Sequence, residues 1–405
     1  MKKIMMVLLV ALLCLPISGS ADHALRIYID ADFSSSLKKS SISIERGLKT
    51  ALSEVDFIVA GQRVEIVRKD HRGSSPRSKR NLEQYLQDEH ALAVFSGLHS
   101  PPLLAHRDFI NEQEILLLDP WAAAGPITRY TEGTNWIFRL SIDDTKAGRV
   151  MVHHALKHRA FKKPYLLLEE TGWGKSNERT MGAALAEMNV SPVGNAWFNW
   201  GLSDLRARAI VRSIEEAEAD VILLVANAPE AAVLFNAIST LNVEVAVVSH
   251  WGITGGDFFE KAVRPIQDTI DLMFIQTNFS FLGLQEEQRG YEVLQRARRL
   301  FPSEISEPRD IEAPTGFVHG YDLGKIFIRA VEQAGLTGDI KVDRRTIRDA
   351  LERLDGSVEG LLKTYREPFS PFSVDAPDAH EALGEPDFTM GSFGENGEIF
   401  LEQVE

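Results

Sequence analysis

The stretch ALAVFSGLHSPP, residues 91–102, sets the pattern on which the rest of the chain is built. Its first part, Ala91–Ser96, is a short apolar run typical of a buried β-strand. Ser100 and Pro101 follow after three residues, and serine at the N-cap with proline at the first helical position indicates a helix start. The stretch therefore predicts a strand, a short loop and a helix in direct succession.

The same alternation extends to both sides of this stretch. Apolar runs and amphipathic segments follow one another in the order β-α-β-α-β-α-β, which predicts a parallel sheet covered by helices on both faces. The expected strands of this first unit are residues 25–29, 64–67, 91–96 and 115–118, and its expected helices are residues 42–55, 81–87 and a segment that begins at Ser100.

A second α/β unit begins near Asp143. Two further helices follow it, and the tail at residues 360–393 is rich in proline, phenylalanine and glycine and is expected to be irregular. We therefore predict an α/β protein with two doubly wound parallel-sheet lobes. The expected strands of the second unit are residues 164–168, 221–225 and 243–248, its helices are residues 143–157, 175–188, 204–217 and 229–241, and the later helices are residues 320–334 and 344–354.

Length, composition and charge limit the class of protein. A chain of 405 residues is long enough for two domains that each bury a core. Hydrophobic residues make up 44% and charged residues 25%, as in soluble globular proteins. The formal net charge of −14 argues against a nucleic-acid partner, which would require a basic face.

The first residues have the features of a secretory signal peptide. Two lysines are followed by an apolar run at residues 4–17 and by small residues at 18–21 that suit signal peptidase. A membrane anchor is the alternative, but the run is short for a span. Cys14, the only cysteine, follows a leucine, whereas a lipoprotein signal needs a small residue there. We expect residues 1–21 to be removed, leaving a periplasmic mature chain that has no disulfide and is not embedded in a membrane.

Polar and aromatic residues follow the expected strands, at the edge where an open parallel sheet binds its ligands. Three of the six tryptophans lie at this edge, although a core tryptophan belongs more naturally within a strand or on a helix face. We expect these residues to converge on one tryptophan-lined ligand site. They are Asp30, Asp32, His99, Ser100, Trp121, Trp173, Asn227, His250 and Trp251.

Eight short segments, taken in their order and spacing, resemble a known family. The chain is similar to the type I periplasmic binding proteins, and within them to the leucine/isoleucine/valine-binding receptors of ABC transporters, over nearly its whole length after residue 21. The segments are residues 29–32, 44–47, 94–100, 120–123, 137–139, 172–174, 229–230 and 320–322.

The resemblance implies two lobes joined by a three-crossover hinge, with a small-molecule ligand buried between them. It implies closure by a hinge motion that selects among open and closed states. The first lobe would comprise residues 22–143 and 277–358, and the second lobe residues 144–276 and 359–405. The partner implied is the permease of an ABC transporter.

The resemblance also assigns single positions in the site. In amino-acid-binding members a serine at a helix start meets the ligand carboxylate, and Ser100 matches it. A threonine that meets both carboxylate and ammonium corresponds to Ala123. An acidic residue that neutralises the ammonium corresponds to Trp251.

Three further positions follow from the same resemblance. Trp173 keeps the aromatic character of its position in the second lobe. Asn227 stands where another aromatic residue is usual, and Ser40 stands where a first-lobe tyrosine is common. The chain therefore departs from the amino-acid-binding pattern at several of its positions.

These departures predict that the ligand is not a free α-amino acid. Pro101 and Pro102 remove two backbone N–H groups where a helix start would hold an anion, and a buried ammonium without a partner is costly. Tryptophan faces suit a planar aromatic or apolar ligand, or a cation held by the ring quadrupoles. Directional hydrogen bonds would come from Asp30, Asp32, His99, His250 and Asn227.

Other functions fit the sequence less well. It contains no Walker loop, G-x-S-x-G, H-E-x-x-H or G-x-G-x-x-G after a strand, and the adjacent His99 and Ser100 point apart, so neither an enzyme nor a cofactor is expected. His154 and His158 have the spacing to share a metal, but flanking basic residues favour a solvated helix face.

Two alternatives stay open at this point. A protein of this shape can pass its closed state to a signalling receptor instead of a permease. Ordinary branched-chain amino acid binding is the second alternative, and the residues do not decide between these and transport of another solute.

Overall fold

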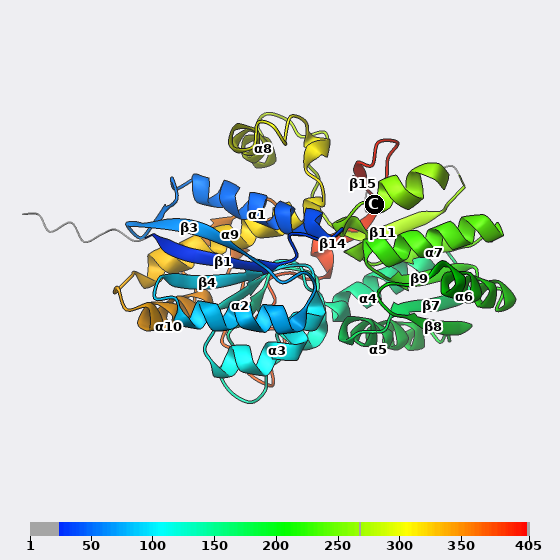
Figure 1. Cartoon of the computed structure of the whole chain (residues 1–405), viewed down its shortest axis with the longest axis horizontal. Helices are drawn as coiled ribbons and strands as arrows, with labels where there is room; N and C mark the ends of the chain where they lie inside the picture. Colours follow the sequence, from blue (N-terminus) through cyan, green and yellow to red (C-terminus); the bar gives the residue numbers. More distant parts are fainter. Residues whose placement is uncertain (1–23, 267–268, 403–405) are drawn as a thin grey trace, which may run out of the picture.

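The computed structural model describes residues 24–266 and 269–402 and arranges them in two lobes that lie side by side (Figure 1). A six-stranded sheet, in the order β2-β3-β1-β4-β5-β6, is the centre of the first lobe. A seven-stranded sheet, in the order β15-β14-β11-β10-β9-β7-β8, is the centre of the second lobe. The predicted α/β class is confirmed, and the expected signal peptide at residues 1–21 lies outside the described residues.

Strand β4 (Ala91–Ser96) is buried along its whole length, as its apolar run predicts. It pairs in parallel with β1 on one side and β5 on the other, so both of its faces are covered. The edge strand β2 pairs antiparallel with β3. The other strands of the first sheet are β1 (Leu25–Ala31), β2 (Ile58–Val59), β3 (Gln62–Asp70), β5 (Leu117–Asp119) and β6 (Ile137–Arg139).

Helices cover both faces of the first sheet (Figure 1). α1 and α9 lie against each other, because a Cβ at Gly47 or Gly320 would overlap the backbone of the opposite helix. The helix expected at residues 81–87 begins earlier, at Ser75, where Pro76 fits a first helical turn. The helices are α1 (Lys38–Ser53), α2 (Ser75–Gln87), α3 (Ser100–Glu112), α8 (Arg289–Leu300), α9 (Pro314–Ala334) and α10 (Ile340–Leu351), with short turns η1 (Gly125–Ile127) and η6 (Pro308–Asp310).

The second lobe is built on the buried parallel strands β7 (Pro164–Glu169) and β9 (Val221–Val225). Its edge strands β14 and β15 run antiparallel. The remaining strands are β8 (Gly194–Phe198), β10 (Ala246–Ser249), β11 (Leu272–Thr277), β14 (Phe388–Phe393) and β15 (Ile399–Leu401). The helices are α4 (Asp144–His153), α5 (Gly172–Glu187), α6 (Asp204–Glu216) and α7 (Ala228–Leu241), with shorter segments η2 (His154–His158), η3 (Trp251–Gly255), η4 (Phe259–Val263), η5 (Arg264–Ile266) and η7 (Glu385–Asp387).

The described chain crosses between the lobes between β6 and α4, after β11, and before β14. The tail at residues 360–393, expected to be irregular, contains β13 (Thr364–Arg366), which pairs with β12 (Ser357–Glu359), and β14, which pairs with β11. The prediction is wrong for these strands, because short antiparallel edge strands leave little periodic signal in the sequence.

Residues 380–382 of the same tail extend the first sheet. The backbone N–H of Arg139 in β6 donates to the His380 carbonyl at 2.9 Å, and the Ala382 N–H donates to the Arg139 carbonyl at 2.9 Å. The assignment of residues 359–405 to the second lobe stays a prediction, and these contacts favour a later return of the chain to that lobe.

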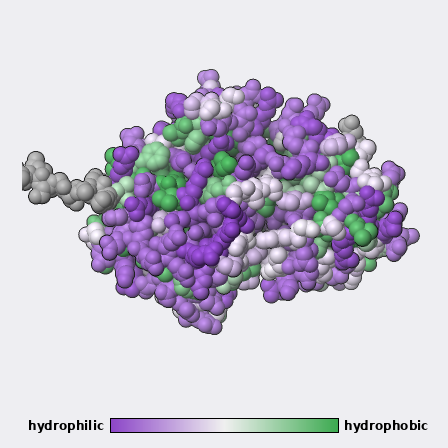
Figure 2. Space-filling model, viewed as in Figure 1, coloured by the Kyte–Doolittle hydropathy of each residue, from purple (hydrophilic) through white to green (hydrophobic). Residues whose placement is uncertain are grey.

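The surface in Figure 2 is hydrophilic over most of this view, with apolar residues in small patches. Beneath it, the buried hydrophobic side chains form a core cluster that includes residues of both lobes. Within residues 24–266 and 269–402, no helix has the length and apolar character needed to cross a membrane.

Candidate functional site

A cavity, here called the inner pocket, lies between the lobes at the carboxyl ends of strands from both sheets. The loops after β4 and β5 supply its first-lobe wall, and the ends of β7, β9 and β10 supply its second-lobe wall. Seven of the eleven residues predicted for the ligand site line it. The full lining is Leu98, His99, Ser100, Pro101, Trp121, Ala123, Glu169, Trp173, Asn227, Trp251 and Gly252.

Three buried indole rings form the walls of the inner pocket. Trp121 of the first lobe and Trp251 of the second lobe have ring centroids 6.1 Å apart, inclined by 60°. The Trp173 Nε1–H donates to Asp144 Oδ1 at 3.2 Å, which fixes the third ring. The free space among the lining side chains is about 10 Å³, the room of roughly one water molecule. The lobes are therefore in close contact around the pocket, which has no room for a larger ligand in this conformation.

One lining residue is a buried carboxyl group that forms no ion pair with a basic side chain within the described chain. Glu169, the last residue of β7, is fully buried. Its Oε2 accepts a hydrogen bond from Asn227 Nδ2 at 3.0 Å, and its Oε1 accepts one from Thr171 Oγ1 at 3.1 Å. Burial, together with the nearby charge of Glu230, raises the pKa of Glu169 to about 7. The pocket thus holds a carboxyl group that titrates near neutral pH.

The start of α3 differs by one residue from the prediction. His99 is the N-cap and Ser100 is the first helical residue, so the expected cap position is wrong by one. The Ser100 hydroxyl accepts the backbone N–H of Ala124 at 3.2 Å. Pro101 and Pro102 follow within the first turn and have no N–H to offer. This helix start is therefore a poor cradle for an anion.

The positions at which an amino acid would find its other polar partners are apolar. Ala123 lines the pocket without a hydroxyl, and Trp251 lines it without a charge. Asn227 also lines the pocket, and its Nδ2 donates one hydrogen bond to Glu169. The geometry therefore leaves Glu169 as the ionisable carboxyl group of the pocket lining.

An outer cavity of about 170 Å³, here called the vestibule, shares His99 and Asn227 with the inner pocket. His99 Nε2 lies 3.5 Å from Asp32 Oδ2. Although burial opposes ionisation, hydrogen bonds from His99 and Ser35 hold the pKa of Asp32 well below its usual range. Trp200 of the second lobe packs on the His99 ring, with centroids 5.4 Å apart. The lining is Asp32, Ser35, Ser36, Leu37, Arg72, Gly73, His99, Trp200, Asn227, Pro229 and Glu230.

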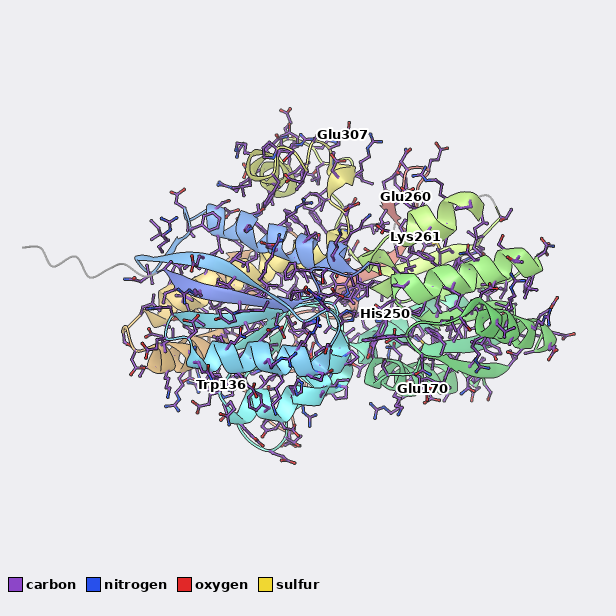
Figure 3. The ribbon with its side chains drawn as sticks, in the orientation of Figure 1. Trp136, Glu170, His250, Glu260, Lys261 and Glu307 are labelled. Atoms are coloured by element: carbon purple, nitrogen blue, oxygen red, sulfur yellow. The ribbon has the colours of Figure 1, made fainter. Side chains whose placement is uncertain are left out.

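Three predicted binding residues, Asp30, Ser40 and His250, line neither cavity. Asp30 is buried, and its carboxylate accepts hydrogen bonds from Ser78 Oγ and Asn81 Nδ2. Ser40 is buried and its hydroxyl donates to the Leu37 carbonyl at 2.8 Å. His250 lies at the junction of the lobes (Figure 3), with its ring edge-on to Trp173 at 5.0 Å and its Nε2 3.5 Å from Asp144 Oδ1. Their contact with a ligand stays a prediction, and in this conformation His250 supports the tryptophan wall from behind.

The histidine pair considered for a metal lies away from this site. The rings of His154 and His158 stack with centroids 6.1 Å apart, and His154 Nδ1 is 3.3 Å from Glu402 Oε2. In the part of the chain that the structure describes, no three His, Cys, Asp or Glu side chains are grouped to hold a metal ion.

Three residues of the site escape the sequence analysis. Glu169 directly follows the expected strand at residues 164–168. The rule that residues just after parallel strands lie at the ligand edge, here called the strand-end rule, selects Trp173 and applies equally to Glu169. Trp200 follows β8, whose half-exposed residues give no clear strand pattern. Asp144 lies at the start of α4, where an acidic residue is ordinary helix chemistry, and its partners become visible only in three dimensions.

Glycines allow the two lobes to touch in the closed conformation. A Cβ on Gly256 of the second lobe would lie 2.6 Å from the backbone carbonyl oxygen of Ser36 in the first lobe. An ion pair between Lys39 and Asp257, 2.8 Å long, joins the lobes beside this contact. A side chain at residue 256 would therefore act as a wedge between the lobes.

Gly256→Ala is expected to shift the protein toward the open conformation. Overpacking costs about 1–3 kcal/mol, and only the closed state suffers the clash, so the closed population relative to the open one falls about tenfold to hundredfold. Small-angle X-ray scattering would show a larger radius of gyration. Gly182→Ala in α5 is the matched control, since its Cβ meets nothing within 4 Å. An unchanged radius for Gly256→Ala would contradict this role of the glycine.

Comparison with known proteins identifies the family and the solved structures that the chain is similar to. The family model described as "Periplasmic binding protein" matches residues 29–382. A type 1 periplasmic binding protein from Bordetella pertussis Tohama I is 17% identical, with a TM-score of 0.78 over 94% of this chain and 100% of that chain. A leucine binding protein from Thermotoga maritima is 16% identical, with a TM-score of 0.73 over 94% and 98% of the two chains.

A third solved structure, a solute binding protein of an ABC transporter from R. palustris in complex with benzoate, is 16% identical. Its TM-score is 0.73 over 94% of this chain and 95% of that chain. No curated protein matches the sequence significantly.

The family match extends from β1 to the tail residues that pair with β6, so it covers the first sheet from residue 29 on, strands β7 to β11 of the second sheet, and the whole lining of the inner pocket. The family consists of binding proteins rather than enzymes, in agreement with the expectation from the sequence. This chain belongs to the periplasmic binding protein family.

Proposed function

We propose that the protein is a periplasmic receptor that captures a small molecule between its lobes and delivers it to an ABC transporter. The observation that carries this proposal is the inner pocket, which both lobes line and three indole rings wall. The ABC-transporter protein of similar fold that holds benzoate supports such a role. The signal-peptide features of the first residues support a periplasmic location.

The ligand we propose is not a free α-amino acid, although one protein of similar fold is named for binding leucine. An α-amino acid needs several donors for its carboxylate, and the two prolines after Ser100 have no N–H, so this helix start offers few of them. Glu169 could meet an ammonium, yet the carboxylate beside that ammonium would find no lysine or arginine in the pocket lining. The carboxylate half of the zwitterion is therefore poorly matched, with the Ser100 hydroxyl and the His99 Nδ1, which has no hydrogen-bond partner among the described residues, as candidate side-chain donors at the first-lobe wall.

Capture follows from the closed geometry. With about 10 Å³ of free space, the inner pocket cannot admit a solute unless the lobes separate. A solute that fills the space between the indoles adds contacts to both lobes only when they close around it, so it favours the closed state. That state would be the one presented to the transporter.

A thermal-shift screen tests the proposed function. Leucine, isoleucine and valine at millimolar concentration are expected to leave the melting temperature unchanged, whereas a cognate solute stabilises the fold by about 3 kcal/mol at a hundredfold excess over its Kd. The stabilisation should shrink in Trp173→Phe but persist in Trp136→Phe, because Trp136 lies in the first lobe away from the junction (Figure 3).

Two outcomes of this screen would contradict the proposal. A clear shift with leucine that Trp173→Phe abolishes would restore ordinary branched-chain amino acid binding as the function. A solute whose stabilisation survives in Trp173→Phe would place binding outside the inner pocket.

A further inference from the structure

The lining of the inner pocket contains one carboxyl group, Glu169. Glu169 is fully buried, and the side chains that donate hydrogen bonds to it, Asn227, Thr171 and Trp200, are all neutral. No lysine or arginine is among the residues that line the inner pocket. A buried carboxylate held only by neutral donors is costly unless a cation accompanies it.

The charged groups around Glu169 do not supply that cation. Glu230 of α7 adds a second negative charge. In the first lobe, the His99 ring lines the pocket, with its Nε2 3.5 Å from Asp32 Oδ2 and its Nδ1 without a hydrogen-bond partner among the described residues, so its nearest charge partner is the Asp32 carboxylate. Arg72 lines only the vestibule, where its Nε lies 3.1 Å from Asp70 Oδ2. The field in the inner pocket is therefore negative when Glu169 is ionised.

The walls of the pocket suit a positive charge as well. Trp121, Trp173 and Trp251 enclose the space beside Glu169, and indole is the aromatic ring that attracts cations most strongly. The attraction increases when the cation is shielded from water, as it would be at these buried rings.

We propose that the solute is a small organic cation, an amine or a quaternary ammonium, whose positive centre lies between the indole rings and Glu169. This inference rests on the proposed receptor function and narrows its ligand to one class. The inner pocket receives the cationic head, and the vestibule, which shares His99 and Asn227 with it, has about 170 Å³ for a short polar tail.

An aromatic acid, the ligand class that the fold comparison brings forward, fits these residues poorly. Its ring would find indole neighbours, but its carboxylate would meet Glu169 and no lining lysine or arginine. Like charges in a buried site disfavour each other strongly. Pro101 and Pro102 also remove the helix-start donors that would otherwise hold a carboxylate.

Isothermal titration calorimetry of the purified protein tests the charge of the ligand directly. The probes are choline and ethanolamine as cations, 3,3-dimethylbutan-1-ol as the uncharged isostere of choline, and benzoate as an anion. We expect at least one cation to bind, and to bind about 100-fold more tightly than the isostere and benzoate.

Variants link that binding to the pocket. Glu169→Gln is expected to weaken cation binding about tenfold to hundredfold while the protein stays folded, and Trp173→Phe to weaken it less. Glu170→Gln is the matched control: Glu170 is the next residue in the chain, is exposed and lies outside the inner pocket (Figure 3). Its affinity should match the wild type.

The pH dependence gives a second measurement that does not rely on a variant's stability. Since the pKa of Glu169 is about 7, cation affinity should fall about tenfold from pH 8 to pH 6 as the carboxylate takes up a proton. Glu169→Gln should lose this dependence, although Glu230, Asp32 and His99 remain in place around the site.

The possible failures are distinguishable. Equal or tighter binding of benzoate or of the isostere overturns the cationic ligand but leaves a solute receptor. If neither cation binds but another solute stabilises the protein in the thermal-shift screen, the cationic ligand is likewise overturned and the receptor function remains. If no compound binds in the calorimetry and none stabilises the protein in the thermal-shift screen, both the receptor function and the ligand class are overturned.

Discussion

Arg139→Met is expected to lower the free energy of unfolding by about 3–5 kcal/mol, because it leaves a buried carboxylate without its partner. Arg139 and Glu381 are both buried side chains, and the guanidinium Nη2 and Nε donate to the two carboxylate oxygens at 2.6 and 2.9 Å. Burial opposes the charge, but Glu381 outweighs it and raises the pKa of Arg139. The remaining Nη1 donates to the carbonyls of Ala122 and Ala124, each at 3.0 Å.

Urea unfolding measures this loss of stability, and two further variants test whether it comes from the unpaired buried charge. Arg139→Met with Glu381→Leu should recover part of the stability, since removing both charges leaves none unpaired. Arg149→Met is the control, because Arg149 pairs with Glu187 at the surface, where an ion pair contributes at most about 1 kcal/mol. A cost below about 1 kcal/mol for Arg139→Met would show that the buried pair does not hold the tail to the first sheet.

Glu169→Gln is expected to stabilise the ligand-free protein at pH 8 and to have little effect at pH 4. The folded-state pKa of about 7 lies above the ordinary value of 4.5, so between these values the folded state holds a proton that the unfolded chain has released. The stability contributed by Glu169 is full below about pH 4.5 and is lost as the pH rises to 7. Its ionised carboxylate therefore costs on the order of 3 kcal/mol at pH 8, which the amide does not.

The measurement is the difference in unfolding free energy between Glu169→Gln and wild type across pH 4 to 8. The difference is needed because burial also raises the pKa values of Asp30, Asp119 and Asp322, which add their own pH dependence to both proteins. Glu170→Gln again serves as the control. A difference that stays constant across this range would mean that Glu169 is not held in a costly ionised state.

The sequence predicts the buried centre of each sheet well and the sheet edges poorly. Strands β4 and β9 are continuous apolar runs, and the structure has them at the predicted residues, Ala91–Ser96 and Val221–Val225. The half-exposed β8 and the tail strand β14 carry mixed residues, so local pattern does not reveal them. β14 becomes a strand because β11 offers it an edge, and that partner lies more than a hundred residues away.

The sequence predicts those site residues whose place follows from their position after a strand. It does not predict features of the site that depend on how the two lobes pack together. Trp121, Trp173 and Trp251 follow strands, and the structure brings them to one cavity, as the strand-end rule expects. His250 obeys the same rule but lies behind the rings, because side-chain direction depends on packing that the sequence does not contain. The isolation of Glu169 from basic residues is likewise a property of the closed pair of lobes.

The indole pair of Trp121 and Trp251 has a consequence for how the protein can be observed. One ring belongs to each lobe, and their centroids are 6.1 Å apart, close enough for the electronic transitions of the two chromophores to couple. Opening the lobes separates the rings and exposes them to water, which ends the exciton coupling in the near-ultraviolet circular dichroism and shifts the fluorescence to longer wavelength. The two indoles are therefore an intrinsic spectroscopic probe of domain motion, which needs no added label and lies in the walls of the pocket itself.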